Sequence, residues 1–215
     1  MRPGVRTLVL VLLALACAGL WACARLPVTT RVVHEDARVA VTLQREVAPP
    51  AYGHPVRLME AEVAAVLRGV SLRREVHLPL RWFERELPPL KAFREDELSI
   101  LASPLAEALA LAGPGERVYF ELYAPGMNPR YGQDLTAGWI AVRGAYFHIA
   151  VEYFHSQQPI GRFSPYDYNY PTPRSAPESY VLYFEPGRFW KIDDVLHRRA
   201  VDLRPFLQSV SGVRP

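Results

Sequence analysis

Tyr146, His148 and Glu152 are the residues of this chain whose types and spacing come closest to a chemical site. They alternate with apolar residues, so an extended chain places all three side chains on one face. An imidazole beside a carboxylate is the pairing that general-base catalysis or a metal site uses. His155 falls on the opposite face, which excludes it from a metal site shared with His148. The simpler interpretation is the solvated face of a half-buried sheet, and that is the expectation.

Asp193, Asp194 and His197 form a second polar cluster. Asp193 and His197 would lie on one face if the segment were helical, although hydrated charges at the end of a hairpin explain the cluster equally well. No HExxH motif accompanies them, which leaves a zinc site little support. The sequence also lacks the GxSxG, GxGxxG and GxxxxGK[ST] motifs. These observations favour a non-enzymatic role, with no metal and no cofactor expected.

Tyr166, Tyr168 and Tyr170 lie within a Pro-rich loop near residues 164–178. In an extended conformation their side chains share one side of the chain. Tyrosines on a loop make good contact surfaces for sugars, peptides or proteins, because each combines a large apolar area with a polar tip. A Pro-rich connection whose tyrosines fold back on a sheet is the simpler alternative.

The first 23 residues are typical of an export signal that ends in a lipid-attachment site. Arg2 and Arg6 precede an uncharged apolar segment that is shorter than the roughly 20 residues of a transmembrane helix. The segment ends in Leu20-Trp21-Ala22-Cys23, which resembles the lipobox of bacterial lipoprotein precursors, with Trp21 bulkier than is usual. The resemblance implies that Cys23 is acylated and becomes the mature N-terminus.

Two other processing sites stay open. Ala16-Cys17 offers a second small residue before a cysteine, and Ala22-Cys23-Ala24 matches the A-x-A pattern of ordinary signal cleavage. If Cys23 is acylated, Ala24 stands where lipoproteins retained in the inner membrane often have aspartate. The resemblance therefore implies a lipid anchor on the periplasmic face of the outer membrane. No cysteine follows Cys23, so the mature chain cannot form an internal disulfide.

The predicted organisation is a signal peptide over residues 1–22 and a single domain over residues 23–215. The signal peptide carries two of the 25 basic residues, which leaves 23 against 22 acidic side chains. This near-neutral balance, without a long basic patch, argues against a nucleic-acid partner.

Apolar periodicity predicts two main helices in the mature chain. In the first, apolar residues recur from Met59 to Val70 and Gly69 is placed to end the helix. The second begins near Glu95, and a kink or a restart is expected at Ser103-Pro104, because proline disfavours a helix interior. Strands are predicted over Val28 to Glu35, Val39 to Val47 and Ser71 to Leu80, and over three segments of period two that begin at Arg117, Trp139 and Tyr146. A further hairpin is predicted to join Tyr180–Glu185 to Arg188–Ile192. A short helix is predicted over Leu203 to Val210. The predicted fold class is α+β, with an antiparallel sheet of roughly five to seven strands packed with two main helices.

Three functions from different classes are compatible with these features. The leading hypothesis is a lipid-anchored envelope protein that binds or assembles with other envelope components through a Tyr/Arg/Glu sheet face or the tyrosine loop. The second is a peptidoglycan or carbohydrate binder that uses the loop. The third is a hydrolase built around His148 and Glu152, which a concave pocket joining both residues to a serine would favour.

Overall fold

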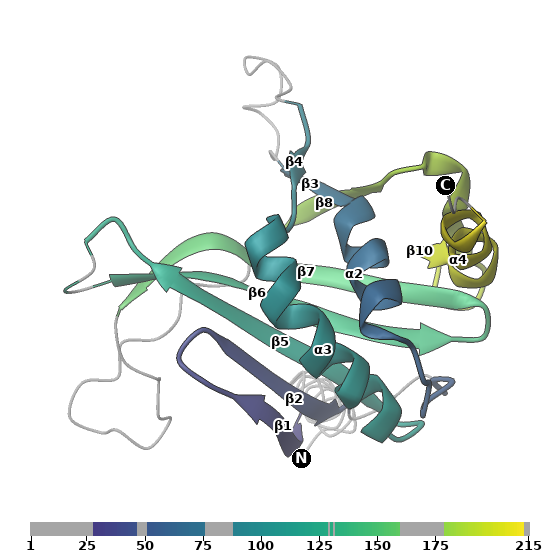
Figure 1. Ribbon diagram of the computed structural model, residues 1–215, viewed down its shortest axis with the longest axis horizontal. Helices are drawn as coiled ribbons and strands as arrows, with labels where there is room; N and C mark the ends of the chain where they lie inside the picture. The colour runs from purple at the N-terminus through teal and green to yellow at the C-terminus, as the bar shows by residue number, and fades with distance from the viewer. Residues whose placement is uncertain are drawn as a thin grey trace, which may run out of the picture.

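A seven-stranded antiparallel sheet organises the fold (Figure 1). The computed structural model describes residues 28–46, 51–75, 88–128, 130, 132–159 and 179–212. In spatial order the strands are β1 (Val28–Glu35), β2 (Val39–Arg45), β5 (Glu116–Pro125), β6 (Gly132–Arg143), β7 (Tyr146–Pro159), β10 (Arg198–Asp202) and β9 (Trp190–Asp193). The predicted α+β class is confirmed.

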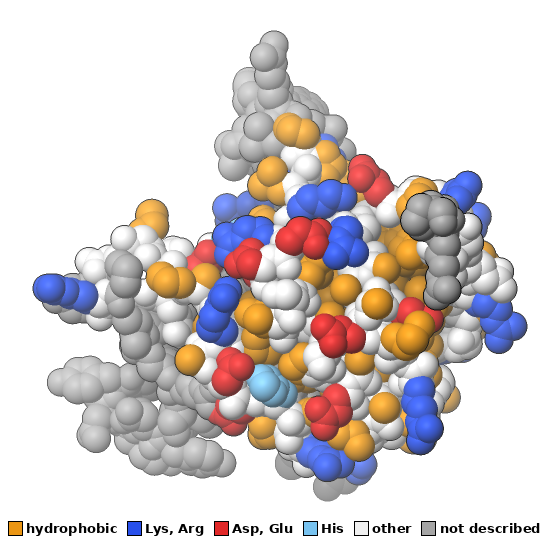
Figure 2. All heavy atoms as spheres, in the orientation of Figure 1, with side chains coloured by type: hydrophobic (Ala, Val, Ile, Leu, Met, Phe, Trp, Pro, Cys, Tyr) orange, Lys and Arg blue, Asp and Glu red, His pale blue; other side chains and the backbone are white. Residues whose placement is uncertain are grey.

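Two helices, α2 (Glu60–Gly69) and α3 (Glu95–Leu111), lie side by side over one face of this sheet (Figure 1). Their apolar stripes pack on alternate residues of the strands and form the main core, in which Leu67, Leu105 and Phe120 are fully buried. A third helix, α4 (Leu203–Ser211), follows β10 and buries Phe206. Figure 2 shows the helical side of the molecule, where charged side chains of both signs are scattered among apolar ones.

Period-two alternation produces the long strands β5, β6 and β7, as predicted. The turn between β6 and β7 contains Gly144 at a φ of +57°, a conformation that glycine adopts without strain. Further along the same ladder, Gly138 faces the carbonyl oxygen of Ala150 so closely that a Cβ atom would not fit. The two strands therefore approach each other at a point where only glycine is compatible with the pairing.

Helix α3 is continuous through Ser103-Pro104, so the restart, one of the two outcomes expected there, is wrong. Proline removes one backbone donor, which costs about 3 kcal/mol inside a helix. Pro104 is buried in the helix interior next to Leu105 and Leu101, and the burial of this apolar face offsets the missing hydrogen bond.

The predicted hairpin around Pro186-Gly187 is also wrong. Its first strand, β8 (Tyr180–Phe184), pairs with β3 (Val70–Arg74) in a separate three-stranded sheet that also contains β4 (Leu90–Lys91). Its second strand, β9, pairs with β10 in the main sheet. A 3-10 turn, Gly187–Phe189, carries the chain from one sheet to the other. Alternation identified both strands correctly, but it contains no information about partners.

His54 joins β5 to β6 where their ladder opens. At this end of the ladder the final backbone pair is Val118 with Ile140. Two residues further along, Glu116 and Val142 are bridged by the imidazole instead. Nδ1 is 2.9 Å from the carbonyl oxygen of Glu116, and Nε2 accepts a 2.9 Å hydrogen bond from the amide of Val142. This arrangement requires a neutral ring with its proton on Nδ1, because a protonated Nε2 could not accept the amide.

Burial lowers the pKa of His54 below its ordinary value of 6.5. Below pH 6.5 the imidazole is therefore protonated in the unfolded chain and still neutral in the folded chain. The contribution of His54 to the free energy of unfolding is fully present above pH 6.5 and falls as the pH drops toward the folded pKa. The same direction holds for the buried His148, whose pKa burial also lowers.

We expect His54→Ala to lower the free energy of unfolding by about 2–4 kcal/mol at pH 7.5, because it leaves a buried amide and a buried carbonyl unpaired and creates a cavity. The variant should also lose part of the stability decrease that the unmodified chain shows between about pH 6.5 and 5.5. Urea denaturation at several pH values measures both effects. His34→Ala, near the end of the edge strand β1, is the control and should change stability by no more than about 1 kcal/mol, because it removes only a partly exposed pair with Asp36. An unchanged pH profile in His54→Ala would contradict the bridge.

Candidate functional site

The sheet face opposite α2 and α3, which we call the outer face, carries most of the candidate residues. Strand alternation places Arg117 of β5, Trp139 of β6, and His148 and Glu152 of β7 on this face. Two small apolar clusters cover part of it, one around Tyr52 and Trp139 and one around Leu135, Ala137 and Tyr153. The predicted Tyr, Arg and Glu residues thus share one side of the sheet, but part of that side is covered, since Trp139 is 5%, His148 1% and Tyr153 6% exposed.

His148 lies at the centre of a buried ionic cluster, which the sequence analysis did not predict. Its Nε2 is 3.0 Å from Oδ2 of Asp193, and Nη1 of Arg143 is 3.0 Å from both oxygens of the same carboxylate. The backbone amide of Val195 also donates to Asp193, at 2.8 Å. His148 is only 1% exposed, so the expectation of a solvated face is wrong at this residue.

The charges in this cluster are set by burial and by hydrogen bonds. Burial lowers the pKa of His148 and outweighs the opposing effect of Asp193, while Arg143 and Arg198 lower it further. Burial works to raise the pKa of Asp193, but the amide of Val195 and the guanidinium of Arg143 together keep it below its ordinary value. The imidazole is therefore neutral and donates its Nε2 proton to an ionised carboxylate that is shared with Arg143.

The cluster is made by a strand end and a turn, which explains why the helical interpretation of Asp193 and His197 is wrong. Asp193 is the last residue of β9, and residues 194–197 form the turn to β10. Asp193 caps this turn through the amides of Val195 and Leu196. His197 has a φ of +50° and is exposed within the turn.

Glu152 has a different partner. One oxygen lies 3.8 Å from Nη2 of Arg117, a guanidinium that also pairs with Glu46 at 3.2 Å and bonds Gln44. His148 and Glu152 thus share the outer face, as predicted, but each belongs to a separate ionic group. The general-base pair that their spacing suggested is not formed. Tyr146 is half-buried at the start of β7, where it pairs with Arg143 and Asp202.

Trp139 joins these groups, because two guanidiniums lie over its indole. Arg117 is 5.1 Å from the ring centroid and Arg198 of β10 is 5.8 Å from it, both within cation–π range. Tyr52 lies against the same tryptophan in the outer apolar cluster, and burial followed by the charge of Glu46 raises its pKa to about 12. Arg198 is exposed, and within the described part of the chain no carboxylate forms an ion pair with it.

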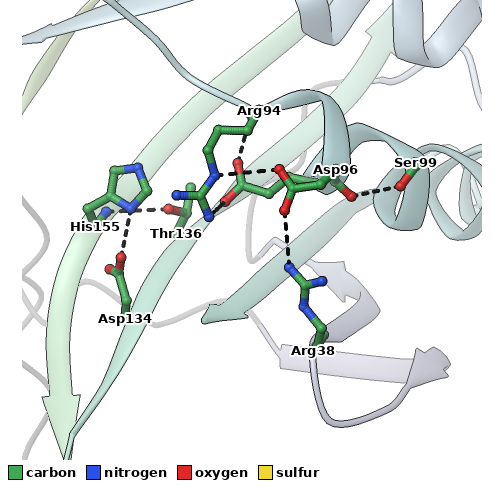
Figure 3. Close-up of polar contacts among 8 residues, drawn as sticks. Arg38, Arg94, Asp96, Ser99, Asp134, Thr136 and His155 are labelled. Atoms are coloured by element: carbon green, nitrogen blue, oxygen red, sulfur yellow. Dashed lines mark hydrogen bonds and ion pairs between the residues drawn. The ribbon is translucent and has the colours of Figure 1, made fainter. Parts of the chain in front are cut away.

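An Asp–His pair at the far end of β6 and β7 was missed by sequence reasoning. Nδ1 of His155 is 2.8 Å from Oδ2 of Asp134, and the backbone amide of His155 donates to Oγ1 of Thr136 at 3.3 Å (Figure 3). His155 adopts a φ of +49° in an irregular stretch of the ladder, where β7 carries extra residues opposite β6. The pair lies at a bulge in the ladder, and the alternation of residues in the sequence does not reveal a bulge.

Figure 3 also shows the N-terminal end of α3 beside this pair. Arg94 bonds the nearly buried Glu97 at 2.8 Å, and Arg38 from the β1–β2 turn lies 3.6 Å from Asp96. Each charge here faces an opposite charge, which is the pattern of a structural ionic network that joins α3 to the strands. Among the described side chains, none donates to or accepts from Nε2 of His155, so no nucleophile is assembled with it.

A groove of about 770 Å³ lies beside α4, within the size range of ligand pockets. Its lining consists mainly of apolar side chains from the segment before α2, the β6–β7 turn and α4, namely Val56, Val142, Ala145, Leu203, Pro205 and Leu207, with Glu62, Asp202, Arg204, Gln208 and Ser211. Neither His148 nor Glu152 is among the lining residues. This groove therefore does not supply the concave pocket around His148 and Glu152 that would favour the hydrolase.

The remaining predicted site residues fall outside the described residues. They are the lipidation candidates Cys23 and Cys17, the signal peptide, and Tyr166, Tyr168 and Tyr170 of the 164–178 loop. Within the part of the chain that is described, no helix is both long and apolar enough to cross a membrane. The same part contains no cluster of three or more His, Cys, Asp or Glu residues arranged to hold a metal ion.

No protein-family model, curated protein or solved structure matches this chain. The interpretation of the outer face therefore depends on its geometry alone.

We expect Asp193→Ala to lower the free energy of unfolding by about 3–5 kcal/mol, because the guanidinium of Arg143 and the Nε2–H of His148 then lose the carboxylate that accepts hydrogen bonds from both. The neighbouring Asp194→Ala removes an equal charge from an exposed turn position and should cost no more than about 0.5 kcal/mol. Urea denaturation of the two variants in parallel gives the comparison. Equal midpoints would show that the buried cluster does not stabilise the fold.

Proposed function

We propose that the protein is a lipid-anchored cell-envelope protein with a non-enzymatic binding or assembly role, held by Cys23 at the periplasmic face of the outer membrane. Its partner is another envelope component, bound through the outer face of the sheet. The lipobox resemblance supports the anchor, and the arrangement of Arg117, Trp139 and Arg198 supports the binding role.

The observation that carries the binding role is the exposed Arg198 over Trp139. Tryptophan, tyrosine and arginine dominate the energetics of protein interfaces, because they combine large area with directed hydrogen bonds. Arg117 is already neutralised by Glu46 and Glu152, whereas Arg198 presents its donors outward. Trp139 and Tyr52 are each only 5% exposed, so the exposed Arg198 guanidinium over the buried indole is the group that meets the partner. An acidic or hydrogen-bond-accepting group on a partner can pair with Arg198.

The geometry favours this role over the hydrolase. His148 donates its Nε2 proton to Asp193, which leaves Nδ1 as the nitrogen that would act as a base. Nδ1 is buried and His148 is only 1% exposed, so a substrate does not reach this base in the present arrangement. The glycan-binding alternative depends on Tyr166, Tyr168 and Tyr170, which lie outside the described residues. The outer face is compatible with a glycan as well as with a protein, since both present hydroxyl and carboxylate groups.

For the anchor, mass spectrometry of the mature N-terminal peptide from membrane extracts should find an acyl-modified Cys23. Cys17→Ala should leave this modification unchanged, whereas Cys23→Ala should abolish it, because acylation requires the thiol. A mature N-terminus at Arg25, or acylation of Cys17, would overturn the proposed anchor.

For the binding face, a photo-crosslinking amino acid in place of Lys191 should form an adduct with an envelope component in intact cells, because Lys191 is exposed, lies on the same face of β9 as Asp193 and leaves Arg198 in place. The same probe in place of Ile192 is a matched control, because consecutive residues of β9 point to opposite faces of the sheet. Adduct yields from position 191 that do not exceed those from position 192 would count against the outer face.

A further inference from the structure

The first described strand begins very close to the proposed lipid anchor. Four residues, 24–27, lie between Cys23 and Val28, the first residue of β1, and the five Cα–Cα steps that join the two span at most about 18 Å. If Cys23 is embedded in a membrane, the start of β1 must therefore stay within about 18 Å of the bilayer surface. This limit comes from covalent geometry and holds for any path of the intervening chain.

The start of β1 is firmly tied to one end of the domain, so the limit applies to that end as a whole. Val28 pairs with Arg45 of β2, and Arg45 pairs with Glu116 of β5. With neighbouring strands about 4.8 Å apart, Glu116 lies about 10 Å from Val28. Its carboxylate accepts a 2.6 Å hydrogen bond from Oγ1 of Thr30 and a 2.9 Å bond from the amide of Gly113.

The turn that Glu116 binds follows the last residue of α3. Figure 1 shows the C-terminal end of α3 at the same end of the molecule as the start of β1 and the end of β2. We call this the anchor-proximal end and define it by Val28, Arg45, Leu111 and Glu116. Two of its apolar side chains are unusually exposed for their type, Val28 at 64% and Leu111 at 41%.

We propose that the anchor-proximal end of the domain contacts the lipid surface, with Val28 and Leu111 at the headgroup boundary. This inference rests on the proposed acylation of Cys23, which brings that end to the membrane. Exposed apolar side chains there can partition into the boundary region, which stabilises one orientation of the tethered domain.

Helix α3 fixes which part of the domain points away. Its 17 residues span about 25 Å from Leu111 to Glu95. Leu90 of β4 lies beyond the Glu95 end, is 61% exposed, and has the same side chain as Leu111. The proposed contact therefore predicts opposite environments for two exposed leucines at opposite ends of α3, Leu111 as its last residue and Leu90 in β4, before its start.

The experiment uses the full precursor, processed in cells, purified and reconstituted into vesicles that contain lipids with a spin-labelled headgroup. Cysteines introduced singly as Leu111→Cys and Leu90→Cys are the only free thiols when Cys23 is acylated, because the mature chain has no other cysteine. Each is labelled with a small fluorophore, and quenching by the headgroup label is measured. We expect severalfold stronger quenching at position 111 than at position 90.

The mass of the N-terminal peptide is measured on the same samples, which separates the two hypotheses. With Cys23 acylated, equal quenching at both positions or stronger quenching at position 90 would overturn the proposed orientation and leave the anchor intact. Absence of the acyl group would overturn the proposed function and this inference together. Acylation with selective quenching at position 111 supports both.

Discussion

The carboxylate of Asp193 is the interaction on which the outer face depends. It accepts hydrogen bonds from a guanidinium, an imidazole and the amides of its own turn, and so connects β6, β7 and the β9–β10 hairpin. A buried charge is tolerated only when such donors surround it, and removal of the carboxylate leaves all of these donors without their acceptor. The same connection holds β10 beside β7 and thereby places Arg198 over Trp139. A cluster built from a histidine and an aspartate therefore has a structural explanation here.

Much of the fold could be predicted from the sequence because its signals are local. The alternation in β5 and β7, the apolar stripe of α2 and the glycine at the β6–β7 turn each depend on neighbours within a few residues. Two predictions were wrong for the opposite reason. Pro104 lies inside α3 because tertiary packing buries that face of the helix. Strand β8 pairs with β3, more than 100 residues earlier in the sequence, and not with β9. Both outcomes are decided by tertiary packing, which overrides local preference.

The candidate site was only partly predictable, for a related reason. Alternation correctly placed His148 and Glu152 on one face of β7, but it could not reveal that His148 meets Asp193, 45 residues later, or that Glu152 meets Arg117 of β5. Nor could it show that His54 replaces a backbone pair between two strands. Ionic and imidazole contacts of this kind join residues whose separation in sequence carries no periodic signal. They become visible only when the order of the strands is known.

The proposed anchor and the proposed binding face constrain each other. Trp139 pairs with Tyr119, which lies three residues along β5 from Glu116, so the tryptophan is about 10 Å from the anchor-proximal end. Together with the roughly 10 Å from Glu116 to Val28 and a linker of at most about 18 Å, this holds the Arg117–Trp139–Arg198 group within about 40 Å of an acylated Cys23. A partner that covers this group must therefore lie close to the same membrane. That constraint favours a membrane-attached envelope protein over a glycan layer farther from the bilayer, because the short linker gives the domain little freedom to reach outward.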